Sequence, residues 1–132
     1  IFNGNLKVAD IPETWNNMMK DWFGIDVPND SLGCLQDIHW SMGAFGYFPT
    51  YTLGNLYAAQ LLQTMGSELG DIDEIIKSGD WSSMLDWLRE KIHIQGSVMT
   101  PSELIESATG MPPSPEPFLN YVEEKYSKLY NL

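Results

Sequence analysis

Five side chains in one short stretch of the chain are of the types that carry chemistry in hydrolytic sites. They are Gln36, Asp37, His39, Tyr47 and Tyr51. Imidazole and phenol groups can donate hydrogen bonds to the oxyanion that forms when a carbonyl is attacked. A carboxylate two positions before a histidine can orient the ring and fix its tautomer. We therefore take His39, Tyr51 and Tyr47 as candidate catalytic residues, and Gln36 and Asp37 as candidate substrate-binding residues.

Each of these side chains also has a structural explanation, and the residues alone leave both open. The imidazole could be structural, and capping nearby backbone is the commoner role of an aspartate in a loop. The tyrosines could pack with satisfied hydroxyls, and the glutamine amide could bond its own loop. The remaining large aromatics of the stretch are expected to be packing residues, namely Trp40, Phe45 and Phe48.

The stretch follows no helical or strand period. A helix repeats apolar residues every three or four positions, and a half-buried strand alternates them. Here polar side chains, aromatics, glycines and Pro49 are mixed. Such composition is typical of an irregular segment, and functional residues often lie in such segments.

Several motifs in the chain resemble the thermostable carboxypeptidase 1 family, which are gluzincin-like zinc metallocarboxypeptidases. Gly33, Gln36, Asp37, His39 and Trp40 match the family's Gly-x-x-Gln-Asp-x-His-Trp motif. Further matches are Phe-Gly-Tyr-Phe-Pro-Thr-Tyr, ending at residue 51, then 53–60, 100–104, 108–110, 114–119 and 125–130. The resemblance covers nearly all of this chain and roughly the C-terminal quarter of a family member.

The family's zinc-binding motif is absent from the chain. His-Glu-x-x-His places two imidazoles on one helix face with the Glu as general base, but the only histidines, His39 and His93, are far apart. His-Pro-Phe, Asp-x-Arg-x-Thr, His-Gln-Glu-Ser-Gln and Ile-Arg-x-x-Ala-Asp are missing too, and the chain begins with Ile1. We expect an excised C-terminal segment, residues 1–132 forming a single domain, with the zinc region outside it.

The resemblance implies a parent enzyme that removes C-terminal residues from peptides. In the family mechanism zinc polarises the carbonyl and activates water, the Glu moves protons, and nearby donors hold the oxyanion. This segment would supply donors and one wall of the cleft. Alone, it is expected to be inactive and to hold no cofactor. Family members tend to be dimers, so a homodimeric parent is expected.

Net charge and cysteine content limit the kinds of molecule that the chain can bind and the compartment that it occupies. The net charge is −11, from 18 acidic and 7 basic residues, which argues against binding nucleic acid or anionic membranes. Cys34 is the only cysteine, so no intrachain disulfide forms and a reducing compartment fits. No signal peptide or membrane-spanning run appears. Together with the resemblance, this predicts a cytoplasmic protein.

Two other candidate sites are weaker. Cys34, Asp37 and His39 are possible metal ligands, but their spacing matches no metal motif. His93 lies near the predicted end of a helix, where the helix dipole favours an imidazolium, and we assign it a structural role. No pattern for a nucleophilic serine appears.

The rest of the chain predicts an all-α bundle of five to six short helices around the irregular segment. Apolar residues recur at helical spacing, and start and stop signals bound the helices. The expected helices are 10–24, about 52–68, 71–79, 80–96, 100–110 and one following the proline-rich connection 111–117. Asp10 with Glu13, Asp71 with Glu74, and Thr100 with Glu103 are the predicted capping boxes.

Two non-enzymatic functions remain as alternatives. One is a non-catalytic helical interaction module, which exposed aromatics without chemistry would favour. The other is a regulatory or chaperone-binding fragment with an independent fold. A His-Glu-x-x-His motif upstream of this segment in the full gene would decide for the enzyme.

Overall fold

The computed structural model describes all residues from 1 to 132, and they form helices and no strands. The α-helices are α1 (Ile11–Phe23), α2 (Pro49–Leu69), α3 (Ile72–Ser78), α4 (Ser82–Lys91), α5 (Pro101–Thr109) and α6 (Glu116–Tyr130). Short 3₁₀ turns are η1 (Val8–Asp10), η2 (Asp30–Leu32), η3 (Cys34–Gln36), η4 (Ile38–Met42) and η5 (His93–Gln95). The prediction of an all-α fold is confirmed.

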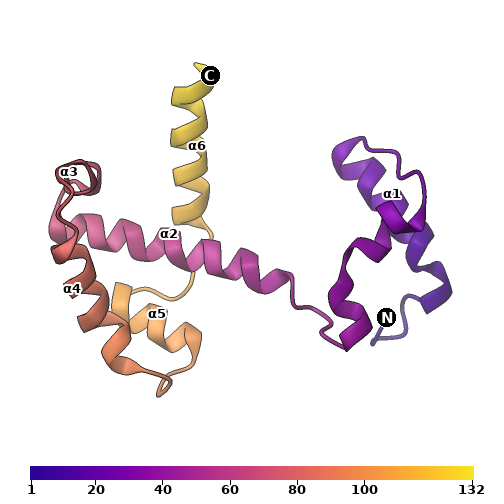
Figure 1. The fold of residues 1–132 in the computed structure, drawn as a ribbon, viewed down its shortest axis with the longest axis horizontal. Coiled ribbons are helices and arrows are strands. Elements are labelled where there is room, and N and C mark those ends of the chain that lie inside the picture. The colour runs from indigo at the N-terminus through magenta and orange to yellow at the C-terminus, as the bar shows by residue number, and fades with distance from the viewer. The chain divides into compact units, whose positions relative to one another are not determined.

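The chain divides into two compact units, Ile1–Tyr47 and Phe48–Leu132. The first holds α1 and the turns η1 to η4, and the second holds α2 to α6 (Figure 1). None of these helices combines the length and the hydropathy that crossing a membrane would require.

Helix α1 begins differently from the prediction. Asp10 is its N-cap residue, but its side chain caps nothing, and the predicted capping box with Glu13 is wrong. Turn η1 leads directly into the helix, so Asp10 has helical angles (φ −92°, ψ −2°) rather than the extended ones that capping needs. Pro12, in the first turn, also lacks an N–H to be capped. The helix ends as expected at Gly24, whose φ of 69° suits glycine.

Helix α2 organises the second unit. It contacts α3, α4, α5 and α6 (Figure 1). Four of these helices contribute buried residues: Gln60 and Met65 on α2, Trp87 on α4, Ile105 and Ala108 on α5, and Pro117 on α6. The helix begins at Pro49, three residues before the predicted start, because proline suits the first helical position.

Glu68 links α2 to α4. One of its carboxylate oxygens accepts the indole N–H of the buried Trp87 at 2.8 Å, and the other lies 3.1 Å from Lys91 Nζ. The hydrogen bond from Trp87, followed by that from Lys91, lowers the pKa of Glu68. The pair of contacts fixes the side of α2 against which α4 packs.

Gln60 is the only polar side chain buried in the chain, with no exposed surface. Its amide nitrogen lies 2.9 Å from Thr109 Oγ1, 3.1 Å from the Met111 carbonyl and 3.2 Å from the Pro112 carbonyl. Its amide oxygen accepts the Ser114 N–H at 3.0 Å. One side chain of α2 thus holds the connection between α5 and α6.

The other two predicted capping boxes have different outcomes. Asp71 caps α3 by accepting the N–H groups of Asp73 and Glu74, but the Glu74 side chain instead pairs with Lys77 at 2.6 Å. Thr100 and Glu103 form the full reciprocal box at the start of α5. The Glu103 carboxylate accepts from the Thr100 hydroxyl at 2.7 Å and from the Thr100 N–H at 2.8 Å.

The capping box gives α5 a stability that depends on pH. The hydrogen bonds from the Thr100 hydroxyl and then its N–H lower the pKa of Glu103 from its ordinary value of 4.5. A lowered folded pKa means that the contribution is complete above the unfolded pKa and is lost as pH falls through the folded pKa. We expect Glu103→Gln to lower the melting temperature at pH 7, with a gap from wild type that narrows below pH 4.5.

Thermal melts of wild type and Glu103→Gln across this pH range would measure the gap. Glu106→Gln, a nearby exposed carboxylate on the same helix, is the matched control. A gap that stays constant in acid would mean that the ionised box adds nothing.

Candidate functional site

The predicted site segment is a series of 3₁₀ turns. Asn29 opens η2 by accepting the Leu32 N–H, and η3 and η4 follow. Gly43, with φ 77°, ends η4. The segment is thus irregular, as predicted, but it is hydrogen-bonded turn by turn and not an open loop.

Asp37 and His39 are brought together at the start of η4. The Asp37 Oδ1 atom is 2.9 Å from His39 Nδ1 and 3.0 Å from the His39 backbone nitrogen. The side chains are largely sheltered, with 10% of Asp37 and 21% of His39 exposed. Of the two explanations open from the sequence, ring orientation and backbone capping, the structure contains both.

Tyr47 lies against the same histidine. Its ring stacks on the imidazole with centroids 4.7 Å apart and planes inclined by 27°. The imidazole therefore has a carboxylate at one ring edge and an aromatic ring on one face. Because both contacts fix the ring plane, the histidine is oriented before any ligand arrives.

The other two predicted site residues, Gln36 and Tyr51, make contacts of their own. Gln36 donates its amide to the Ser31 carbonyl, which is the bond within its own loop that the sequence left open. Tyr51 belongs to the second unit, where it lies in the first turn of α2 with 59% of its surface exposed. Its ring meets Phe48 edge to face at 6.2 Å.

The expected packing residues are only partly buried. Phe45 and Phe48 expose 48% and 45% of their surfaces. Phe45 stacks on Trp40 with centroids 6.4 Å apart. Trp40 also lines a hollow of about 220 Å³, with residues of the N-terminal segment and of α1. Trp40 and Phe45 thus pack within the first unit, whereas Phe48 belongs to the second.

Gly33 sits where no side chain fits. A Cβ atom there would lie 2.7 Å from Val27 Cγ1 and 3.2 Å from the Asn29 carbonyl oxygen. The residue follows η2 and precedes η3, so its close approach sets how the turns leading to Asp37 fold.

We expect Gly33→Ala to destabilise the chain by about 1–3 kcal/mol, the usual cost of overpacking. Gly54→Ala is the matched control, because a Cβ at Gly54 meets nothing within 4 Å. Gly54 lies inside α2, so alanine there should be stabilising by about 0.5–1 kcal/mol. Urea titrations would measure the free energy of unfolding of both variants. Equal effects of the two substitutions would contradict the assigned role of Gly33.

The chain's own residues do not fit a metal ion. No three His, Cys, Asp or Glu side chains gather in a group that could hold one. Cys34 is buried, and Asp37 is already engaged with the His39 ring and backbone. His93, predicted in a helix end, lies instead in turn η5 after α4.

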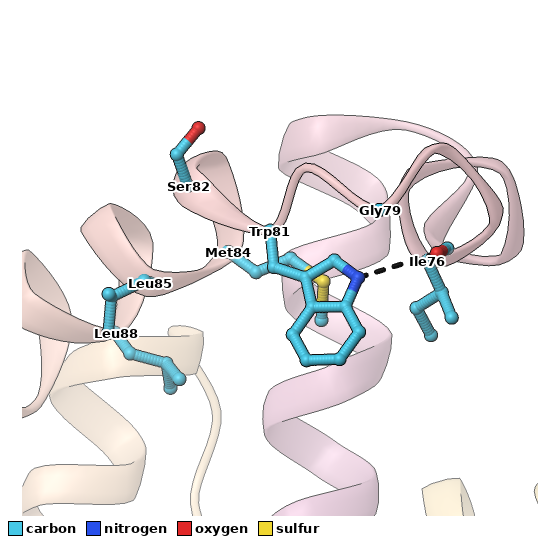
Figure 2. Close-up of a pocket in the computed structure, with 7 residues that line it drawn as sticks. All are labelled: Ile76, Gly79, Trp81, Ser82, Met84, Leu85 and Leu88. Carbon is cyan, nitrogen blue, oxygen red and sulfur yellow. Dashed lines mark hydrogen bonds between the residues drawn. The ribbon is translucent and has the colours of Figure 1, made fainter.

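A further hollow lies on α3 and α4, and none of the side chains that line it is ionisable. It measures about 660 Å³, and all the residues that line it except Ser82 are apolar: Ile76, Gly79, Trp81, Met84, Leu85 and Leu88 (Figure 2). The Trp81 indole N–H points at the Ile76 carbonyl oxygen, 3.4 Å away. A lining that is apolar except for one serine suits burial of an apolar group.

Sequence reasoning did not single out Gln60, the most completely buried residue of the chain. The signal available was a lone polar residue in the apolar run Tyr57-Ala-Ala-Gln-Leu-Leu62. Its role is to join α2, the helix that begins beside Tyr51, to the connection before α6.

Comparison with known proteins gives consistent matches. The family model described as carboxypeptidase Taq (M32) metallopeptidase matches residues 1–126. Thermostable carboxypeptidase 1 of Thermus thermophilus is 46% identical over 98% of this chain and 26% of its own length. Carboxypeptidase 1 of Bacillus subtilis is 42% identical over all of this chain and 26% of its own length.

Solved structures agree with the sequence matches. The M32 carboxypeptidase from Deinococcus radiodurans superposes with a TM-score of 0.93 at 35% identity, over 98% of this chain and 26% of that one. Trypanosoma cruzi metallocarboxypeptidase 1 superposes with a TM-score of 0.88 at 43% identity, over 94% and 26%. The chain spans about a quarter of the length of these relatives.

Proposed function

Because the chain belongs to the carboxypeptidase Taq (M32) metallopeptidase family, we propose that it works as part of a longer zinc carboxypeptidase. The substrates are peptides, from which residues are removed at the C-terminus. Within that enzyme, residues 1–132 act as a C-terminal domain that supplies hydrogen-bonding groups to the substrate.

The observation that carries this proposal is the oriented histidine. The contacts from Asp37 at 2.9 Å and from the Tyr47 ring at 4.7 Å restrain His39 on an edge and on a face. Restrained donors are what stabilise an oxyanion, because they need no reorganisation when charge develops. His39 is therefore assigned to hydrogen bonding with the reacting carbonyl, and Asp37 to holding its ring.

Tyr51 is the second assigned donor. It is carried by the first turn of α2, a 21-residue helix that Gln60 and Glu68 fasten to the rest of the second unit. A phenol on a rigid helix is positioned more accurately than one on a loop. Tyr47 contributes through its stacking on His39, and Gln36 through contact with the substrate backbone.

The metal of this enzyme needs ligands from outside residues 1–132. The family is one of metallopeptidases, yet the side chains present do not form a ligand set. We assign zinc, and the general base beside it, to the remainder of the polypeptide. Cytoplasmic localisation and a homodimeric enzyme complete the proposal.

Metal analysis and a peptidase assay test whether the zinc ligands lie outside residues 1–132 and whether the full-length protein is the active carboxypeptidase. After dialysis, the 132-residue chain should retain far less than one zinc per molecule and should not hydrolyse a blocked dipeptide. The full-length protein should retain zinc and release the C-terminal residue. Stoichiometric zinc in the short chain would place the ligands within it, and a zinc-loaded full-length protein without carboxypeptidase activity would overturn the function.

A further inference from the structure

In the hydrogen bond between Asp37 and His39, only one of the two side chains can be the donor. An ionised carboxylate only accepts hydrogen bonds, whereas an imidazole nitrogen either donates or accepts. The 2.9 Å contact therefore requires the hydrogen to be on His39 Nδ1. The same Asp37 oxygen accepts the His39 backbone N–H at 3.0 Å, so both of its donors belong to one residue.

This double contact fixes the carboxylate relative to the ring. Asp37 is the N-cap residue of η4, with extended backbone angles (φ −80°, ψ 91°) that turn its side chain toward the following N–H groups. Only 10% of its side chain is exposed, so water competes little for the oxygen. Tyr47, stacked on the ring at 27°, opposes rotation about the bond that would exchange the two ring edges.

We infer that Asp37 holds His39 in the tautomer protonated at Nδ1, so that the ring can bond a substrate only through Nε2. In the neutral ring Nε2 carries a lone pair and accepts. Only the protonated ring donates from Nε2. Asp37 is thus a positioning residue that decides whether the histidine offers a donor or an acceptor.

This inference rests on the proposed function for its consequence in catalysis. If His39 donates to the reacting carbonyl, it does so as an imidazolium. Asp37 and Tyr47 both lie against the ring. A carboxylate and an aromatic face are both suited to a cationic ring. The ligand group recognised through Nε2 is then an anionic or partly anionic oxygen.

Nuclear magnetic resonance of the 132-residue chain tests the tautomer without any assay of activity. The chain has only two histidines, so long-range ¹⁵N–¹H correlations give two resolved patterns. In alkaline solution, where the rings are neutral, His39 should show the pattern of Nδ1 protonation. Exposed His93 is the internal reference for an unconstrained ring. A wild-type His39 pattern of Nε2 protonation would overturn the inference.

Two variants sharpen the measurement. In Asp37→Ala the His39 pattern should move to that of His93, whereas Asp37→Asn, which keeps a side-chain oxygen, should retain more of the Nδ1-protonated form. An unchanged pattern in Asp37→Ala, with the helical spectrum intact, would show that Asp37 does not set the tautomer. If Asp37→Ala fails to fold, the wild-type pattern alone still decides.

A second arm uses the full-length enzyme. Glutamine at position 39 offers an N–H group near the place of Nε2 but does not titrate. The kcat of His39→Gln relative to wild type should therefore be higher in alkaline solution, where an imidazole is neutral, than in acid. A ratio independent of pH would mean that neutral His39 already donates, which contradicts the inference. A full-length protein inactive on peptides would instead overturn the proposed function and leave the tautomer result intact.

Discussion

Replacing His39 by alanine in the full-length enzyme is expected to lower kcat by about 10²–10³-fold, the usual cost of removing one oxyanion donor. The KM should change little, because a contact made mainly in the transition state acts on kcat. Tyr51→Phe should have an effect of the same order, since it removes only the phenol hydroxyl. Steady-state kinetics with a blocked dipeptide would measure both.

The controls for this prediction separate chemistry from folding and metal loss. Tyr57→Phe removes a phenol hydroxyl from the same helix and should leave kcat near wild type. Zinc content should be unchanged in His39→Ala and Tyr51→Phe. Near-normal turnover in both would reduce these residues to structural roles. Loss of zinc from folded His39→Ala would make the histidine a metal ligand.

Gln60→Leu is expected to lower the free energy of unfolding by about 2–4 kcal/mol, because partners of the buried amide would be left unsatisfied. Leucine is similar in size, so the loss is mainly of hydrogen bonds. The groups affected are the Thr109 hydroxyl, the Met111 and Pro112 carbonyls, and the Ser114 N–H. Urea unfolding followed by circular dichroism would measure the change.

Gln63→Leu is the matched control for Gln60→Leu. It makes the same substitution one helical turn away, at an exposed position of α2, and should change stability by less than about 0.5 kcal/mol. If the two variants are equally stable, the connection between α5 and α6 does not depend on the Gln60 amide.

Local signals predicted the helices well wherever the backbone at the signal adopts the expected conformation. Thr100, extended at ψ 157°, forms its capping box, and Gly24, Gly79 and Gly110 end helices with positive φ. Asp10 failed as a cap because the turn before it is already helical. Such a turn depends on how the preceding residues pack, which a local pattern does not contain.

The site was predicted as far as its contacts are local. Asp37 and His39 are two positions apart, so the sequence could suggest their pairing, and the structure contains it. Gln60 was missed because its partners lie 49 to 54 positions away. The catalytic roles of His39, Tyr47 and Tyr51 stay predictions, because they concern a substrate and a metal bound by a longer protein.

The reactivity of Cys34 can be used to measure local opening of the first unit separately from the second. It is the only thiol in the chain, and 4% of it is exposed. A thiol reagent reaches it only when the surrounding turns open, so the alkylation rate reports the free energy of that local opening. Comparing alkylation rates in wild type and Gln60→Leu would then reveal whether weakening residues 48–132 also loosens the turns that hold His39, or whether the two units open independently.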